Sequence, residues 1–435
     1  MTMAGLLASA ALVAGFAVAV VVAGRLARRS GLGLAHPAVA WVALHAVLFG
    51  IGGIALALVD DRPSAAVYTG AAVLVFSIGA LASEALAARR TAASADRPST
   101  DWPSTDRPST GDRAPVRLVV AVVLAVASVA LVVPTLLESG IPFLTTDITG
   151  SRTEIAGLVV QPLRVALPAL AIALVLRARR TDPAERRRAL VVAVGAIAII
   201  GAFELLLASR YLIAELAAAL VLAWLLAGGR FAWRVAAAGV LAAAVLFGGV
   251  QLLRAWDLAA EDPLGFLAER TVSRVVLVQP RTLDALVDRI PDDEPFFLGL
   301  TWVRRAGPLF GRDDIPNLGY WIYPAAVDDP SASGGYAAPG LIGEAWANFG
   351  WVGLLLLGLT GVAAERLGAL TAARRDGSAD VVAASLAILF LARTHALGLV
   401  GLGVLWLLVA LWRLADGPES GLGRDIRRVL AWRTG

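Results

Sequence analysis

Runs of about 20 apolar residues recur along almost the whole chain, and they constrain its fold more than any other feature. A helix needs about 20 such residues to cross a hydrocarbon core about 30 Å thick. Eleven stretches reach or approach this length: 4–24, 38–59, 66–88, 116–137, 155–176, 189–208, 211–228, 231–253, 341–364, 379–394 and 396–413. The last two are short and flank Arg393, so that ten spans with one long broken helix is the alternative. The pattern predicts an all-α polytopic integral membrane protein.

The composition agrees with this class of protein and excludes several others. Of the 435 residues, 58% are hydrophobic and 17% are charged, whereas soluble domains carry about 25% charged residues. The chain has no cysteine and three histidines, which excludes disulfides and thiolate ligands and leaves little room for a histidine metal site. The sequence also lacks the motifs of nucleotide-driven transporters and metalloproteases. We therefore expect neither a metal nor a cofactor.

The basic residues orient the chain in the membrane. All 38 are arginines, and most of them flank apolar stretches, which is typical of membrane orientation and not of a nucleic-acid surface. Short loops rich in Arg favour the cytoplasmic side. Eleven spans with an outside N-terminus put the basic loops 25–37, 89–115 and 177–188 and the C-terminal tail inside. We expect a multi-pass protein of the cytoplasmic (inner) membrane with a cytoplasmic C-terminus.

The same reasoning divides the chain into six parts. They are transmembrane helices 1–3 in 1–90, a disordered cytoplasmic linker in 91–115, helices 4–8 in 116–253, an extracytoplasmic loop in 254–340, helices 9–11 in 341–413 and a basic cytoplasmic tail in 414–435. The linker repeats Asp-X-Pro-Ser-Thr three times and cannot bury a core. The large loop is rich in aromatic residues, and 264–290 has a helical period. We expect one or two amphipathic helices that cap the membrane bundle.

Arginines outside or within the membrane are candidates for function, because an Arg at a helix centre costs about 2.5–3.5 kcal/mol. Those in question are Arg152, Arg164, Arg210, Arg254, Arg270, Arg274, Arg281, Arg304, Arg305 and Arg393. A guanidinium binds phosphate in a fork, so several of them around one outer cavity would suit a lipid-linked pyrophosphate. The alternative is local pairing with acidic residues or with lipid phosphates.

Carboxylates supply the second set of candidates. Asp147 lies in the loop that precedes Arg152, and Glu344 lies in 340–350 with Asn348. Glu344 is either an interfacial anchor or a general base at a cavity edge. Glu204 and Glu215 are intramembrane acids that would partner Arg164 or Arg210, or form a proton path in a transporter.

Four segments together resemble one family. The stretches 139–157, 209–213, 290–316 and 339–358, which include SGIPFLTTDITGSRTEIAG, SRYLI and PGLIGEAWANFGWVGLLLLG, are similar to elements of bacterial oligosaccharide repeat-unit polymerases, the O-antigen polymerase (Wzy-like) family. Their order matches over roughly residues 130–400. The resemblance implies glycosyl transfer on the outer face of the cytoplasmic membrane. It does not distinguish polymerase from ligase activity.

The resemblance also implies partners and site residues. The partners would be polyprenyl-pyrophosphate-linked glycans as donor and acceptor, the lipid bilayer, and flippase and chain-length regulator proteins. Arg152, Arg210 and Glu344 would be catalytic, and Asn348 would be a helix-entry or substrate-binding residue. The carboxylate argument adds Asp147 as a substrate-binding candidate. The charge argument alone adds three further substrate-binding candidates: Arg304, Arg305 and Arg393.

Two other functions remain open. One is a polyprenyl-phosphate-sugar-dependent glycosyltransferase with another acceptor, for which Asp60 and Asp61 would be the acidic pair of the first outer loop. The other is a polysaccharide or lipid transporter (flippase), which predicts interrupted helices in matching halves of the chain. Pro162 and Pro168 in one span are the feature that fits it.

Overall fold

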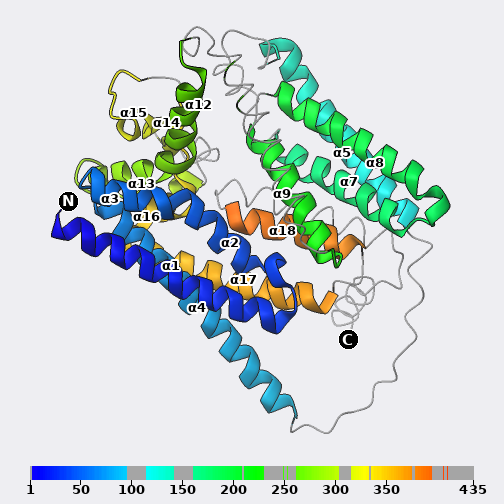
Figure 1. Ribbon diagram of the computed structural model, residues 1–435, viewed down its shortest axis with the longest axis horizontal. Helices are drawn as coiled ribbons and strands as arrows, with labels where there is room; N and C mark the ends of the chain where they lie inside the picture. The colour runs from blue at the N-terminus through cyan, green and yellow to red at the C-terminus, as the bar shows by residue number, and fades with distance from the viewer. Residues whose placement is uncertain are drawn as a thin grey trace, which may run out of the picture. The chain divides into compact units, whose positions relative to one another are not determined.

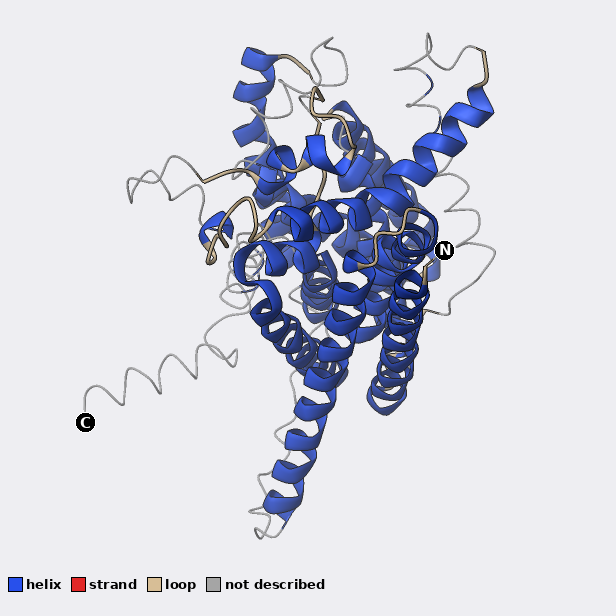
Figure 2. Cartoon of the chain, turned by 90° about the vertical axis from the view of Figure 1, so that its left-hand side faces the viewer, coloured by secondary structure: helices blue, strands red, loops and turns tan. Residues whose placement is uncertain are grey.

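The computed structural model of the chain describes residues 2–95, 114–141, 160–207, 210–229, 261–302, 315–332, 335–374 and 378–393, together with residues 248, 252, 405 and 409. Within these residues every regular element is a helix (Figure 2). Six helical stretches among them are long and apolar enough to cross a membrane: Met3–Ser30, Pro37–Val59, Ser64–Arg89, Leu118–Ser139, Pro183–Leu206 and Gly340–Ala373. The described chain is all-α, with the apolar helices expected of a membrane protein. The predicted spans 231–253 and 396–413 lie almost wholly outside the described residues.

The chain forms two compact units that alternate along the sequence. The first comprises Met1–Asp96, Arg230–Ala372 and Leu391–Ala396. The second comprises Arg97–Gly229, Ala373–Phe390 and Leu397–Gly435.

The long helices of the first unit pack through small residues. They are α1 (Met3–Ser30), α2 (Pro37–His45), a π turn η2 (Ala46–Gly50), α3 (Ile51–Val59), α4 (Ser64–Ala95) and α17 (Leu354–Arg374), shown in Figure 1. A Cβ on Gly15 of α1 would lie 2.7 Å from the carbonyl oxygen of Gly70, and one on Gly79 of α4 would lie 2.0 Å from that of Gly358. Such close backbone approach is a common way for helices to associate in lipid.

The shorter helices of the first unit form a cap, by which we mean the described residues of 261–349. Its elements are α12 (Pro263–Thr271), a π turn η4 (Val272–Leu277), α13 (Val278–Arg289), α14 (Leu318–Trp321), α15 (Tyr323–Ala326) and α16 (Gly340–Phe349). Leu283, Leu286 and Ile290 are fully buried, and they share a core with Phe49 and Tyr68 from the long helices. Burial of this kind contributes about 1.5–3 kcal/mol per large side chain, so the cap is packed onto the long helices by its own apolar face.

The predicted span 341–364 is not one regular helix. α16 ends at Phe349, and a 3₁₀ turn η6 (Gly350–Gly353) precedes α17. Gly350 has φ 55° and ψ −133°, a conformation that only glycine adopts easily. A Cβ there would also lie 2.7 Å from the Phe296 ring. The apolar run therefore divides into a buried cap helix and a longer helix.

The second unit contains α5 (Ala114–Ser139), α7 (Val160–Arg180), α8 (Pro183–Leu206), α9 (Arg210–Leu226) and most of α18 (Ser378–Arg393), as far as Phe390. Leu163, Leu167, Ile200 and Leu216 belong to the core that joins α5, α7, α8 and α9. Many large apolar side chains of α5 and α8 are exposed, as in Leu137 at 80% and Ile199 at 72%. Such surfaces suit a lipid environment better than water. Most of the predicted linker, residues 96–113, lies outside the described residues.

Candidate functional site

The Glu344–Asn348 segment forms α16, which is almost completely enclosed. Residues from Ile342 to Asn348 are all buried. The indole N–H of Trp346 is 3.2 Å from the carbonyl oxygens of both Leu286 and Ile290 and so fixes α16 against the end of α13. Tyr68 donates a hydrogen bond of 3.0 Å to the carbonyl of Gly350. α16 is therefore held at both its middle and its end.

Asn348 uses its whole amide group to hold a neighbouring segment. It is 0% exposed. Its Oδ1 accepts from the backbone N–H of Gly299 at 2.8 Å, and its Nδ2 donates to Thr301 Oγ1 at 2.7 Å and to the Glu344 carbonyl at 2.8 Å. The N–H groups of Phe297 and Leu298 donate to the carbonyls of Ala347 and Asn348 at 3.1 and 3.0 Å. Asn348 thus positions residues 297–301, which supports a positioning role for it.

Glu344 lies one turn before Asn348, on the same side of α16, and its residue is 9% exposed. Its carbonyl accepts the Asn348 amide. The roles that the sequence suggests for Glu344, an anchor or a base at a cavity edge, stay predictions.

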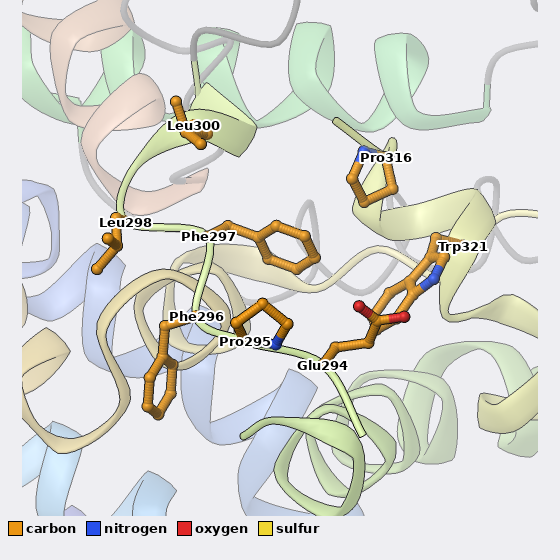
Figure 3. Close-up of a pocket in the computed structure, with 8 residues that line it drawn as sticks. All are labelled: Glu294, Pro295, Phe296, Phe297, Leu298, Leu300, Pro316 and Trp321. Atoms are coloured by element: carbon orange, nitrogen blue, oxygen red, sulfur yellow. The ribbon is translucent and has the colours of Figure 1, made fainter. Parts of the chain in front are cut away.

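A pocket of about 400 Å³ opens beside the segment that Asn348 holds (Figure 3). Its lining comprises Glu294, Pro295, Phe296, Phe297, Leu298, Leu300, Pro316 and Trp321. The rings of Phe297 and Trp321 meet edge to face, with centroids 5.9 Å apart and planes at 88°. The Arg289 guanidinium lies 5.5 Å from the centre of the Trp321 ring. Aromatic walls with a few polar groups are typical of small-molecule sites, which span about 300–1,000 Å³.

A cluster of charges joins the cap to the loop between α3 and α4. Arg62 lies 3.7 Å from Asp284 and 3.2 Å from Asp328, and Arg281 lies 3.9 Å from Asp60. Asp284 is 1% exposed. Burial is the main cause that raises the pKa of Asp284 to about 6, and the nearby charge of Asp288 raises it further. The charge of Arg62 and the hydrogen bond from the Ala65 N–H act in the opposite direction. The hydrogen bond to Asp328 is the main cause that raises the pKa of Arg62.

The acidic pair Asp60–Asp61 is engaged within the chain. Asp60 pairs with Arg281, and Asp61 accepts a hydrogen bond from the hydroxyl of Thr2. Both carboxylates therefore have local partners that fix the ends of α1 and α13.

The second unit holds one of the candidate arginines in an ion pair. Arg164 of α7 lies 3.2 Å from Glu215 of α9, and both side chains are largely buried. This bears out the local-pairing alternative for Arg164. Glu204 of α8 is 2% exposed and lies in the same unit. Ionised groups in apolar helices are costly unless they are paired, and the Arg164–Glu215 pair meets that requirement.

The remaining predicted site residues are described only in part. Arg152, Asp147, Arg304 and Arg305 lie outside the described residues. Arg210 begins α9 and Arg393 ends α18, and their side chains are not among those described.

Three residues of the cap were missed as site candidates in the sequence. Glu294 and Trp321 line the pocket, and Asp284 carries the perturbed pKa. Trp321 could have been recognised in the sequence as an aromatic residue in a polar loop. Glu294 could have been recognised as an acidic residue next to Pro295-Phe296-Phe297. Nothing in the sequence marks Asp284 as a site candidate, because its partner Arg62 is far away in the sequence.

Within the described ranges, no group of three or more His, Asp or Glu side chains is arranged to hold a metal ion. The chain matches no protein-family model, no curated protein and no solved structure.

Proposed function

We propose that the protein is a membrane glycosyltransferase that polymerises or ligates polyprenyl-pyrophosphate-linked oligosaccharide repeat units on the outer face of the cytoplasmic membrane, for cell-surface polysaccharide synthesis. One observation supports it most. Two of the segments that carry the family resemblance, 290–316 and 339–358, are joined by hydrogen bonds between residues 297–299 and the end of α16. Glu344 and the aromatic pocket therefore belong to one folded cap.

The reaction needs a base and an anion-stabilising group. A hydroxyl oxygen of the acceptor glycan attacks the anomeric carbon of the donor sugar, and the bond from that carbon to the pyrophosphate oxygen breaks. Polyprenyl pyrophosphate leaves with the electron pair, and the hydroxyl proton passes to a base. Cationic groups that stabilise the leaving anion lower the barrier by several kcal/mol, roughly 2.7–4 for one such contact, and a positioned base contributes about 10²–10⁴-fold.

The proposed roles follow from side-chain chemistry. Arg152 and Arg210 bind the pyrophosphate, because a guanidinium forms paired hydrogen bonds with phosphate oxygens. Glu344 takes the proton from the acceptor hydroxyl, and Asn348 keeps the adjoining segment in place. Asp147, Arg304, Arg305 and Arg393 are further substrate-binding candidates.

A transporter of lipid-linked glycans is the second candidate. The observation that favours it is the set of ionisable groups within the apolar helices of the second unit, namely the Arg164–Glu215 pair and the buried Glu204. Intramembrane ionisable residues often mark substrate or proton pathways. A transporter would move a lipid-linked glycan across the bilayer and leave its length unchanged.

A deletion strain separates these functions. The polymerase proposal predicts that single lipid-linked repeat units accumulate on the outer face of the membrane and that long polymer disappears. An Arg210→Ala copy should fail to restore polymer, whereas Arg187→Ala, in the exposed start of α8, should restore it. Accumulation on the inner face would instead support the transporter, and normal polymer in the deletion strain would contradict both.

A further inference from the structure

We infer that the pocket lined by Phe297 and Trp321 binds a sugar ring of the glycan chain. This inference rests on the proposed function and deepens it by assigning a saccharide subsite. Among the described residues that line this pocket, none is a candidate for pyrophosphate binding or catalysis.

The shape of the pocket suits a ring with a hydrophobic face. Figure 3 shows the side chains of Phe297, Pro316 and Trp321 gathered around one space, with the carboxylate of Glu294 beside Trp321. The edge-to-face arrangement of the two aromatic rings makes a corner of two surfaces. An aromatic face carries partial negative charge and attracts polarised C–H groups, and one face of a pyranose ring presents such C–H groups.

The polar groups suit hydroxyls and disfavour a phosphate. Glu294 is exposed at the pocket edge, and an ionised carboxylate accepts hydrogen bonds through two oxygens. Hydroxyl groups of a sugar can donate to both of them. This carboxylate would repel a pyrophosphate, and the nearby Arg289 guanidinium lies against the Trp321 ring, 5.5 Å from its centre.

The walls of the pocket are held in place before any ligand arrives. Residues 297–299 are bonded to the end of α16, and the N–H of Leu300 donates to the Phe297 carbonyl at 2.9 Å. On the other side of the pocket, Trp321 ends α14. The Ala337 N–H donates a 2.9 Å hydrogen bond to the Gly319 carbonyl and so ties α14 to the segment before α16. A preformed site loses less conformational entropy when a ligand binds.

Saturation-transfer NMR on the purified full-length protein tests this inference. The probe is the soluble repeat-unit oligosaccharide released by mild acid from the producing strain's own polysaccharide. We expect transfer to its ring protons with wild-type protein, and affinity about tenfold weaker for Trp321→Ala and for Glu294→Gln. Trp321→Phe should retain most binding because it keeps an aromatic face. Asp293→Asn, at the exposed neighbouring acid outside the pocket lining, is the matched control and should bind as wild type does.

Kinetics with lipid-linked substrates identify which glycan occupies the pocket. For an acceptor subsite, Trp321→Ala raises the KM for the acceptor about tenfold and leaves the KM for the donor unchanged, and a donor subsite gives the reverse. Oligosaccharide binding that is equal in Trp321→Ala, Glu294→Gln and wild type would overturn the inference. A second result would also overturn the inference: the wild-type protein binds a soluble polyprenyl phosphate analogue but no oligosaccharide, and Trp321→Ala abolishes binding of that analogue.

The two proposals fail in distinguishable ways. If the oligosaccharide binds in this pocket but no lipid-linked donor is consumed, the subsite stands and the glycosyltransferase proposal fails. If transfer occurs but the wild-type protein shows no oligosaccharide binding and all pocket variants keep wild-type kinetics, the glycosyltransferase proposal stands and the subsite is wrong.

Discussion

The guanidinium of Arg62 lies 3.7 Å from the carboxylate of Asp284, which is almost completely buried in the cap. Arg62 comes from the loop between α3 and α4, so this pair links the cap to the long helices of the first unit. Asp328 lies 3.2 Å from the same guanidinium. Arg62 thus contacts two parts of the cap, and the buried Asp284 is the carboxylate whose pKa is raised.

The first prediction is that the contribution of Asp284 to the free energy of unfolding falls as pH rises. The pKa of Asp284 is about 6 in the folded protein, against 3.8 ordinarily, so the folded state binds its proton more tightly. The contribution is complete below about pH 4 and is lost as pH rises through 6, by about 3 kcal/mol. Thermal unfolding of Asp284→Asn, which stays neutral, should show a higher midpoint than wild type at pH 7.5 and a similar one at pH 3.5. Parallel pH profiles for the two proteins would show that Asp284 does not titrate in this way.

The second prediction concerns Asn348. Asn348→Ala leaves the part-buried Gly299 N–H without its side-chain partner, at a cost of about 1 kcal/mol, and releases residues 297–301. We expect a lower unfolding midpoint and weaker oligosaccharide binding. Asn317→Ala is the control, since Asn317 makes no side-chain cap hydrogen bond at the start of α14, and it should unfold close to wild type. Equal midpoints for both variants would remove the positioning role of Asn348.

The third prediction tests the glycine contact between α4 and α17. Gly79→Ala places a methyl group 2.0 Å from the Gly358 carbonyl oxygen, so the helices must separate, at a cost of about 1–3 kcal/mol. Gly195→Ala in α8 meets nothing within 4 Å and should be neutral or stabilising by about 0.5–1 kcal/mol. Unfolding midpoints in detergent measure both. A Gly79→Ala variant as stable as Gly195→Ala would mean that the two helices do not approach this closely.

The fourth prediction is the orientation in the membrane. Because the chain has no cysteine, single cysteines report cleanly. A cysteine at the exposed Ser331 should react with an impermeant maleimide in intact cells, and one at the exposed Glu185 should react only after permeabilisation. The charge asymmetry of the loops is the reason. The opposite labelling pattern would show that the chain has the reverse topology.

Hydropathy predicted an all-α protein with apolar helices, and six such helices are long enough to cross a membrane within the described residues, because length and apolarity largely decide what crosses a bilayer. The count of eleven spans stays a prediction. Hydropathy did not predict the break at Gly350, since the residues on both sides of it are equally apolar and only the backbone angles change. It also could not pair Arg62 with Asp284, or Glu294 with Trp321, because these contacts depend on how the cap folds. The helical period of 264–290 predicted helices there, and Leu283 and Leu286 lie in a core, whereas Val272 is 50% exposed in a π turn.

The most direct test is glycan transfer by the purified protein in liposomes, with a lipid-linked repeat unit as donor and acceptor. The account predicts a ladder of longer lipid-linked glycans and release of polyprenyl pyrophosphate. Arg152→Ala and Arg210→Ala should each lose about 100- to 1000-fold in rate, Glu344→Gln should keep donor binding and lose turnover, and Arg187→Ala should match wild type. No elongation by a folded wild-type protein, or near-normal rates for both Arg152→Ala and Arg210→Ala, would contradict it.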